Sequence, residues 1–242
     1  METTVIQQLV GEFFGTLILM YIGNGVNAGN TLKKTKSYNT GWLIVAIGWG
    51  LAVTMAVYSV GWLSPAHLNP AVTLGMAVAG HIEWALVLPY ILVQVLGGIA
   101  GATLMWLHYY PHFKETEDPE AILGVFSTAP AIRGNKWNLV SETMATAVLL
   151  YGLLAFTQGD FTEGLNPLVV GLLIVTIGLS LGGTTGYAIN PARDLGPRIA
   201  HQLLPIANKG DSDWKYAWIP IVGPLFGGAL GGLLFLFITS VR

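Results

Sequence analysis

The tripeptide Asn-Pro-Ala occurs twice, as Asn69-Pro70-Ala71 and as Asn190-Pro191-Ala192. Pro is favoured at the first position of a helix, where its missing N–H would have no partner, and Asn just before it is a strong N-cap. Each copy therefore predicts the start of a helix. We expect these two helices over residues 70–79 and 191–200, the first ending where Gly80 interrupts the apolar run.

Both predicted helices are too short to cross a membrane. About ten residues rise roughly 15 Å, which is half of a hydrocarbon core of about 30 Å. Two such half-helices that enter from opposite faces would meet near the midplane. Because the N-terminus of a helix carries partial positive charge, both positive ends would converge on one place.

The composition indicates a protein that is solvated by lipid. Hydrophobic residues make up 53% of the 242 residues and charged residues only 10%, against about 25% charged residues in soluble domains. The net charge of −2 and the lack of a basic run argue against nucleic acid as a partner. With no Cys, no disulfide or thiolate metal site is expected. No cleaved signal peptide is expected either, since the first residues lack a basic region.

Six apolar segments are long enough to span a bilayer. They cover residues 6–27, 41–60, 84–107, 137–157, 165–183 and 217–239. A charged stretch lies between the third and the fourth segment and is the natural midpoint. We therefore expect an all-α membrane protein in which residues 1–242 form one domain. Its two repeats, at about 1–110 and 134–242, would be joined by a linker at 111–133.

The two halves of the chain resemble each other. Matches at an offset of 130 residues join Glu12 to Glu142, Gly48 to Gly178, and Gly97 to Gly227. The Asn-Pro-Ala copies are offset by 121 residues. Each half holds three long spans, an odd number, so the second half must insert upside down. This inversion brings the two half-helices in from opposite faces.

Two acidic residues lie inside predicted spans, Glu12 in the first and Glu142 in the fourth. Buried charge is expensive in a membrane and is usually functional. A carboxylate there can accept hydrogen bonds from the N–H groups of the loop before a half-helix, which need partners at that depth. We favour this supporting role over direct contact with a permeating solute, and over a role in proton relay.

Arg193 breaks the repeat, because the first copy of the motif has Val72 at the corresponding position. Arg is a permanent cation with five donors, so we expect it to face the permeating solute. The alternative is a structural Arg that binds loop carbonyl groups. Asp194 follows it along the helix and would point elsewhere, so Asp194 is expected to hold the loop.

The segments 67–73 and 190–194, together with Glu12 and Glu142, resemble the major intrinsic protein family of aquaporins and aquaglyceroporins. The Asp after the Arg is similar to the glycerol-facilitator branch. The resemblance implies six tilted helices and two half-helices around one pore in each subunit of a homotetramer. The amides of Asn69 and Asn190 would donate to a passing hydroxyl group, and an Asn can cap a helix through its oxygen at the same time.

The resemblance also implies a narrow filter made of four residues, Trp49, Gly178, Tyr187 and Arg193. Two aromatic faces would form an apolar corner for a carbon backbone, and Arg193 would donate to hydroxyl groups on the other side. Gly178 would leave open the space that water-selective relatives fill with His. For Trp49 the alternative is an aromatic residue that only packs or faces lipid.

Five residues in and around the two motifs have expected roles of their own. Tyr187 stands where familiar glycerol facilitators have Phe, and its hydroxyl could narrow the filter or offer another hydrogen bond. Pro65 stands where the family usually has Gly and would stiffen the loop. His67 could line the vestibule or gate the pore with pH, but a hydrogen-bonded structural His is favoured. Pro70 and Pro191 are assigned to structural support.

We therefore predict a passive channel in the cell membrane for glycerol and other small neutral solutes, such as water, urea, dihydroxyacetone and undissociated lactic acid. It would exclude ions and protons and need no cofactor or metal. The alternatives are a water-selective aquaporin and an ion-coupled secondary transporter of small polyols, which also has broken helices and inverted repeats. An enzyme is not expected, since no nucleophile and base or phosphate loop is visible.

The orientation in the membrane rests on the resemblance alone. Family topology places both termini in the cytoplasm. Of the 11 Lys and Arg residues, only Arg242 would then lie in a cytoplasmic loop or tail. The positive-inside rule favours the reverse orientation. We expect the family topology, because the match of fold and motifs spans the whole chain.

Overall fold

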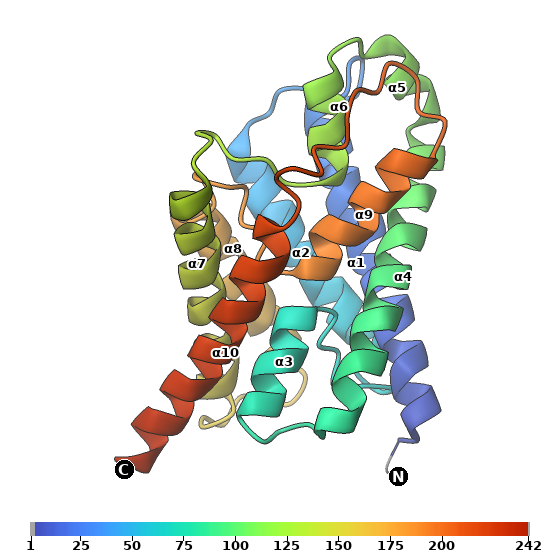
Figure 1. Cartoon of the computed structure of the whole chain (residues 1–242). Helices are drawn as coiled ribbons and strands as arrows, with labels where there is room; N and C mark the ends of the chain where they lie inside the picture. The colour runs from blue at the N-terminus through green and yellow to red at the C-terminus, as the bar shows by residue number, and fades with distance from the viewer. Residues whose placement is uncertain (1–2, 242) are drawn as a thin grey trace.

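The computed structural model describes residues 3–241 and contains ten helices and no strand in this part of the chain. The helices are α1 (Val5–Thr31), α2 (Trp42–Val60), α3 (Pro70–Val78), α4 (Trp84–His108), α5 (Tyr110–Glu115), α6 (Pro119–Phe126), α7 (Asn135–Phe156), α8 (Asn166–Ser180), α9 (Pro191–Leu203) and α10 (Ile219–Ser240). The predicted all-α membrane fold is confirmed, and the ends of the described chain lie on the same side of the molecule (Figure 1).

Five helices, α1, α2, α4, α7 and α10, are long and apolar enough to cross a membrane. They match five of the six predicted spans. The remaining predicted span, 165–183, was too long, because α8 contains only 15 residues and rises about 22 Å. The chain turns directly after α8, where Gly182 and Gly183 are poor helix formers.

The second half-helix, α9, runs three residues beyond the predicted end at residue 200 and stops at Leu203. The ammonium group of Lys209 donates to the carbonyl oxygens of His201 at 2.8 Å, Gln202 at 2.8 Å and Leu204 at 2.6 Å. The last carbonyl groups of a helix lack partners within the helix. Lys209 therefore supplies the cap that lets α9 continue.

The predicted linker at 111–133 is not an irregular connection, since it contains most of α5 and all of α6. Asp118 caps α6 by accepting from the N–H groups of Glu120 and Ala121, and Pro occupies the first turn. Asn24 of α1 then donates to the carbonyl oxygens of Val125 at 2.7 Å and Phe126 at 2.9 Å. The end of the linker is thus fastened to α1 inside the protein.

Close approach of long helices depends on glycine at equivalent places in the two halves. A Cβ atom on Gly101 of α4 would clash with the carbonyl oxygen of Leu17 in α1. One on Gly231 of α10 would lie 2.7 Å from the carbonyl oxygen of Ala147 in α7. Gly231 follows Gly101 by 130 residues, and Ala147 follows Leu17 by the same number. The α1–α4 pair and the α7–α10 pair therefore repeat the same packing within one subunit.

Each half-helix packs against the last long helix of the other repeat. A Cβ on Gly98 of α4 would lie 2.9 Å from the carbonyl oxygen of Ala192 in α9, and one on Gly228 of α10 would clash with that of Ala71 in α3. Figure 1 shows α3 and α9 in opposite halves of the molecule, with their N-terminal ends toward its middle. The Ala of each Asn-Pro-Ala motif therefore lies at a close contact between the repeats.

Candidate functional site: a pore between two half-helices

The first Asn-Pro-Ala motif forms a helix cap and a contact between the repeats. The Oδ1 atom of Asn69 accepts from the N–H groups of Ala71 at 2.8 Å and Val72 at 3.4 Å. Its Nδ2 atom donates to the carbonyl oxygen of Ile189 at 2.8 Å. Because an amide nitrogen carries two hydrogens, one remains for a solute.

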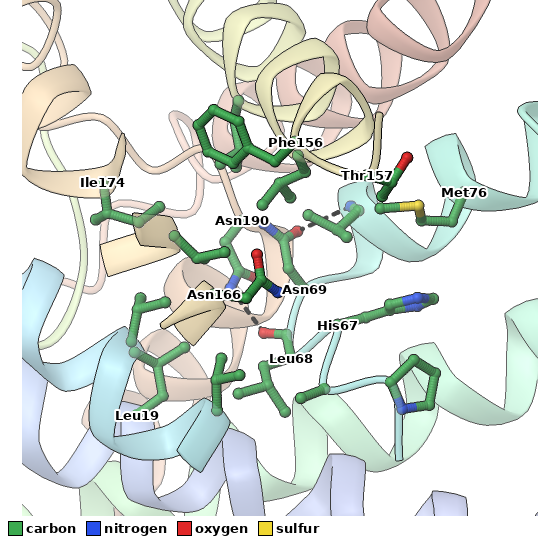
Figure 2. Close-up of a pocket in the computed structure, with 18 of the residues that line it drawn as sticks. Leu19, His67, Leu68, Asn69, Met76, Phe156, Thr157, Asn166, Ile174 and Asn190 are labelled. Carbon is green, nitrogen blue, oxygen red and sulfur yellow. Dashed lines mark hydrogen bonds between the residues drawn. The ribbon is translucent and has the colours of Figure 1, made fainter. Parts of the chain in front are cut away.

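The second motif repeats this arrangement in the opposite direction. Asn190 accepts through Oδ1 from the N–H groups of Ala192 at 3.0 Å and Arg193 at 3.2 Å, and it donates through Nδ2 to the carbonyl oxygen of Leu68 at 2.8 Å. Figure 2 shows the side chains of Asn69 and Asn190 close together at the cavity. The two loops hold each other by a reciprocal pair of hydrogen bonds.

The two loops also share an unusual backbone. Four non-glycine residues adopt positive φ, Ala66 at 52°, Leu68 at 51°, Tyr187 at 39° and Ile189 at 43°. Such angles are uncommon outside glycine and are kept only where the surrounding structure enforces them. The pairs are offset by 121 residues, as are the motifs. The strained backbone directs successive N–H groups of each loop to the buried glutamate.

Glu12 is fully buried and holds the first loop. Its Oε1 accepts from Ser64 Oγ at 3.0 Å and from the N–H of His67 at 2.9 Å. Its Oε2 accepts from the N–H of Leu68 at 2.7 Å and from Gln94 Nε2 at 2.8 Å. Both oxygens therefore have their hydrogen-bond donors within the protein.

Glu142 is fully buried and makes the equivalent contacts in the second loop. Oε1 accepts from Thr185 Oγ1 at 2.6 Å and from the N–H of Ala188 at 3.0 Å, and Oε2 accepts from the N–H of Ile189 at 2.9 Å. Neither Glu12 nor Glu142 lines the central cavity. This geometry favours the supporting role over contact with a solute.

A cavity of about 670 Å³ runs past both motifs. Of the sequence-predicted site residues, it is lined by Trp49, His67, Asn69, Tyr187, Asn190 and Arg193. Gly178 is not among the lining residues. The remaining wall is largely apolar and includes Leu19, Ile174 and Met76, which Figure 2 shows around the two asparagines. The cavity thus has a few polar groups on an apolar wall.

Arg193 and Trp49 lie against each other at the cavity. The guanidinium carbon is 4.0 Å from the centroid of the Trp49 ring, which is the geometry of a cation–π contact. Nη1 of Arg193 donates to the carbonyl oxygen of Phe126 at 3.3 Å, and Nε1 of Trp49 donates to Asn27 Oδ1 at 2.9 Å. Arg193 therefore both binds a loop carbonyl group and faces the cavity.

Gly178 does not leave open space, contrary to the sequence-based expectation. A Cβ atom there would lie 2.9 Å from Cζ and 3.1 Å from the hydroxyl oxygen of Tyr187. The Tyr187 hydroxyl is buried and has no hydrogen-bond partner among residues 3–241. The ring thus fills the place beside the glycine, and the hydroxyl group points into packed protein instead of offering a hydrogen bond to a solute.

Asp194 is buried and ties α9 to the end of the linker. Its Oδ2 accepts from the N–H of Thr128 at 2.8 Å and from Thr128 Oγ1 at 2.7 Å. Its Oδ1 pairs with Nε of Arg198 at 2.7 Å, with both side chains fully buried. Arg198 also donates to the carbonyl oxygens of Ser212 at 2.7 Å and Thr128 at 3.0 Å.

Sequence reasoning missed Asn27, Thr128 and Arg198 as supports of the site. Asn27 and Thr128 carry no motif and meet the site only through folding. Arg198 could have been found, because an Arg four residues after Asp194 on a helix is placed to form an ion pair.

His67 lines the cavity and is also bonded to the protein. Its backbone N–H donates to Oε1 of Glu12, and Nδ1 of its ring lies 3.2 Å from Thr73 Oγ1. Pro65, two residues earlier, also lines the cavity. These contacts favour a His that is held in place by hydrogen bonds.

The cavity also reaches a loop that the sequence did not single out. Residues 159–164, between α7 and α8, line it together with Thr157 and Asn166. Tyr58 of α2 donates to the carbonyl oxygen of Gly164 at 2.6 Å. This loop contributes two acidic residues, Asp160 and Glu163, to the cavity wall.

Two inverted repeats, half-helices that meet at a central cavity, and apolar outer helices define a pore-forming membrane protein. Comparison with known proteins agrees. The chain belongs to the major intrinsic protein family, whose model matches residues 1–235.

Individual relatives cover nearly the whole chain. It is 63% identical over 235 residues to glycerol uptake facilitator protein 3 of Lactiplantibacillus plantarum, covering 97% of this chain and 98% of the relative. It is 57% identical over 225 residues to the glycerol uptake facilitator protein of Bacillus subtilis, covering 93% and 82%. The X-ray structure of the aquaglyceroporin from Plasmodium falciparum has a TM-score of 0.86 at 28% identity, covering 99% of this chain and 100% of that one.

Proposed function

We propose that the protein is a passive channel for glycerol and other small neutral solutes. The observation that carries this proposal is the cavity, in which polar groups stand on an apolar wall. Asn69, Asn190 and Arg193 offer N–H donors, while Trp49 and Tyr187 offer aromatic surface. A polyol has hydroxyl groups on one edge and carbon on the other, so it matches such a wall. The names of the relatives support the same solute.

The two half-helices provide the barrier to cations. The N-termini of α3 and α9 both face the cavity beside Asn69 and Asn190. Two positive helix ends together with donor-only groups oppose the passage of cations. The same donors orient each hydroxyl group that passes, which interrupts a chain of hydrogen-bonded water along which protons could hop. Water, urea, dihydroxyacetone and undissociated lactic acid are proposed as further solutes.

An ion-coupled transporter is disfavoured by the state of the buried carboxylates. A coupling ion needs free oxygen ligands, but Glu12 and Glu142 accept hydrogen bonds from their loops on both oxygens. Within the described range 3–241, no cluster of three or more His, Asp or Glu residues could hold a metal ion. A water-selective channel remains the second candidate, because Tyr187 occupies the space beside Gly178.

Assembly and orientation are proposed from the family. We infer a homotetramer in the cell membrane, with one pore in each subunit and both termini in the cytoplasm. Exposed apolar residues on α2, α4 and α10, such as Leu51, Leu92 and Phe237, fit contact with lipid or a neighbouring subunit. The loops that carry most of the Lys and Arg residues lie on the side away from the termini (Figure 1). A protease-protection assay on tagged vesicles would test the orientation.

The function is tested by stopped-flow volume changes of proteoliposomes in matched glycerol and sucrose gradients. We expect fast glycerol entry that rises linearly with concentration and does not respond to ion gradients. Fast water flow without glycerol entry would support a water-selective channel. Saturation, or dependence on an ion gradient, would support a transporter.

A further inference from the structure

Trp42 contacts the filter from outside the cavity. It is the first residue of α2 and is 42% exposed, and it does not line the cavity. Its Nε1 atom donates to the carbonyl oxygen of Gly178 at 2.9 Å. Its ring meets the Tyr187 ring edge-on, with centroids 5.6 Å apart and an interplanar angle of 81°. One surface residue thus touches two of the predicted filter positions.

Two glycines of the α8 region complete this packing. A Cβ on Gly182 would lie 2.5 Å from Cδ1 of Tyr187 and 2.8 Å from Cζ2 of Trp42. A Cβ on Gly178 would meet the other end of the Tyr187 ring. The ring of Tyr187 is therefore enclosed by Gly178, Gly182 and Trp42 on the side away from the cavity.

Packing is what holds Tyr187 in place. Its hydroxyl group has no hydrogen-bond partner in the described part of the chain, and its backbone has φ of 39°. A non-glycine residue in this region is strained and stays there only if its surroundings enforce it. Removing the indole would open space behind the ring and release the carbonyl group of Gly178.

We propose that Trp42 is a positioning residue for solute selectivity, which sets the width of the pore by holding the Tyr187 ring against α8. This inference rests on the proposed function, since it takes the cavity beside Tyr187 as the solute path. Trp42 acts through Tyr187 and does not itself touch the solute. The consequence is that selectivity depends on a residue at the outer surface of the helix bundle.

The test compares Trp42→Ala and Trp42→Phe with the wild type in proteoliposomes. The measured quantity is the ratio of erythritol to glycerol permeability, because a wider pore favours the larger polyol. We expect Trp42→Ala to raise this ratio about threefold or more, as contacting residues couple by this order. Trp42→Phe keeps a ring but loses the N–H donor, so it should lie between. Trp62→Ala is the matched control. Like Trp42, Trp62 precedes the first Asn-Pro-Ala motif, but it is 72% exposed and its indole N–H bonds only Ser59.

A double-mutant cycle with Tyr187→Ala separates positioning from general stability. If Trp42 acts through Tyr187, Trp42→Ala should not change the ratio further in the Tyr187→Ala background. The same four proteins are followed by thermal unfolding, where non-additive shifts are expected. If Trp42→Ala conducts glycerol with an unchanged ratio of erythritol to glycerol permeability, or if the effects in the cycle are additive, this inference is overturned while the proposed function stands. Absence of glycerol flux in the wild type would overturn the proposed function, while the unfolding cycle would still decide whether Trp42 holds Tyr187.

Discussion

The two half-helix loops have the same backbone frame but different side-chain chemistry. Ala66 and Leu68 in the first loop match Tyr187 and Ile189 in the second, all four with positive φ. In each loop two consecutive N–H groups bind a buried glutamate, and one asparagine crosses to the other loop. The repeat therefore encodes the backbone frame, and each half needs the other because its asparagine donates to a carbonyl group of the opposite loop.

The residues after the asparagines differ between the loops. The first half has Val72 and Thr73, and Thr73 bonds Gln94 within the same repeat at 3.0 Å. The second half has Arg193 and Asp194, which bind Phe126 and Thr128 at the end of the linker. The Arg and the Asp that follow the asparagine therefore occur in one half only, and both bind the linker between the repeats.

The largest expected effect is from removing the buried glutamates. Glu12→Ala and Glu142→Ala each leave two backbone N–H groups buried without a partner, at about 1–3 kcal/mol each. Both variants should lose most glycerol flux and unfold at lower temperature, as measured in proteoliposomes and by thermal unfolding in detergent. Glu12 has four donors and Glu142 three, so Glu12→Ala should be the less stable. Wild-type behaviour of either variant would contradict the supporting role, and Glu117, which is exposed and does not line the cavity, provides the Glu→Ala control.

The next effect comes from making the second half resemble the first. Arg193→Val introduces the residue that the first loop has at the corresponding position, Val72. It removes the guanidinium group and the contacts of that group with Trp49 and Phe126. We expect the ratio of glycerol to water permeability to fall about tenfold, equivalent to about 1.4 kcal/mol. Stopped-flow measurement of both solutes checks this result. Arg133→Val, at an exposed ion pair with Asp213, should leave the ratio unchanged; an unchanged ratio in Arg193→Val would remove Arg193 from the filter.

A smaller effect is expected at the contact of α8 with Tyr187. Gly178→Ala places a methyl group 2.9 Å from Cζ of Tyr187, and overpacking of this kind costs about 1–3 kcal/mol. The ring should move toward the cavity and reduce glycerol flux several-fold while water flux falls less. Gly183→Ala is the matched control, because a Cβ there meets nothing within 4 Å. Equal flux in the two variants would show that Gly178 is not coupled to the pore.

The smallest effect is expected for Tyr187→Phe. The hydroxyl group is buried beside Gly178 and bonds no group in residues 3–241, so its loss removes neither a solute contact nor a protein hydrogen bond. We expect glycerol and urea permeabilities within about twofold of the wild type and unchanged or slightly higher thermal stability, since removing an unpaired buried polar group is close to neutral. A large change in selectivity would place the hydroxyl group in the solute path.

Much of the fold could be predicted because a bilayer restricts what the chain can do. Apolar length predicted five spans to within a few residues at most ends, and the N-cap chemistry of Asn69-Pro70 and Asn190-Pro191 predicted where the half-helices begin. Helix ends were less certain. The extension of α9 to Leu203 depends on Lys209, which lies beyond the helix and folds back onto it.

The candidate site was predicted only in part. Its motif residues stand out in the sequence because Asn, Arg and Glu are rare in apolar segments. Asn27 and Thr128 could not be found this way, since each is an ordinary polar residue that reaches the site through long-range packing. The relation between Gly178 and Tyr187 was misjudged for the same reason: a glycine shows that space is needed there, but not what fills it.

The sequence by itself determined the membrane environment, the inverted repeat and the two capped half-helices, because these depend on local composition, spacing and cap chemistry. Only the tertiary structure decided that Tyr187 fills the space beside Gly178, that Trp42 packs behind it, and that the linker binds Arg193 and Asp194. These contacts join residues far apart in the chain. They depend on how close packing places side chains, which no local pattern specifies.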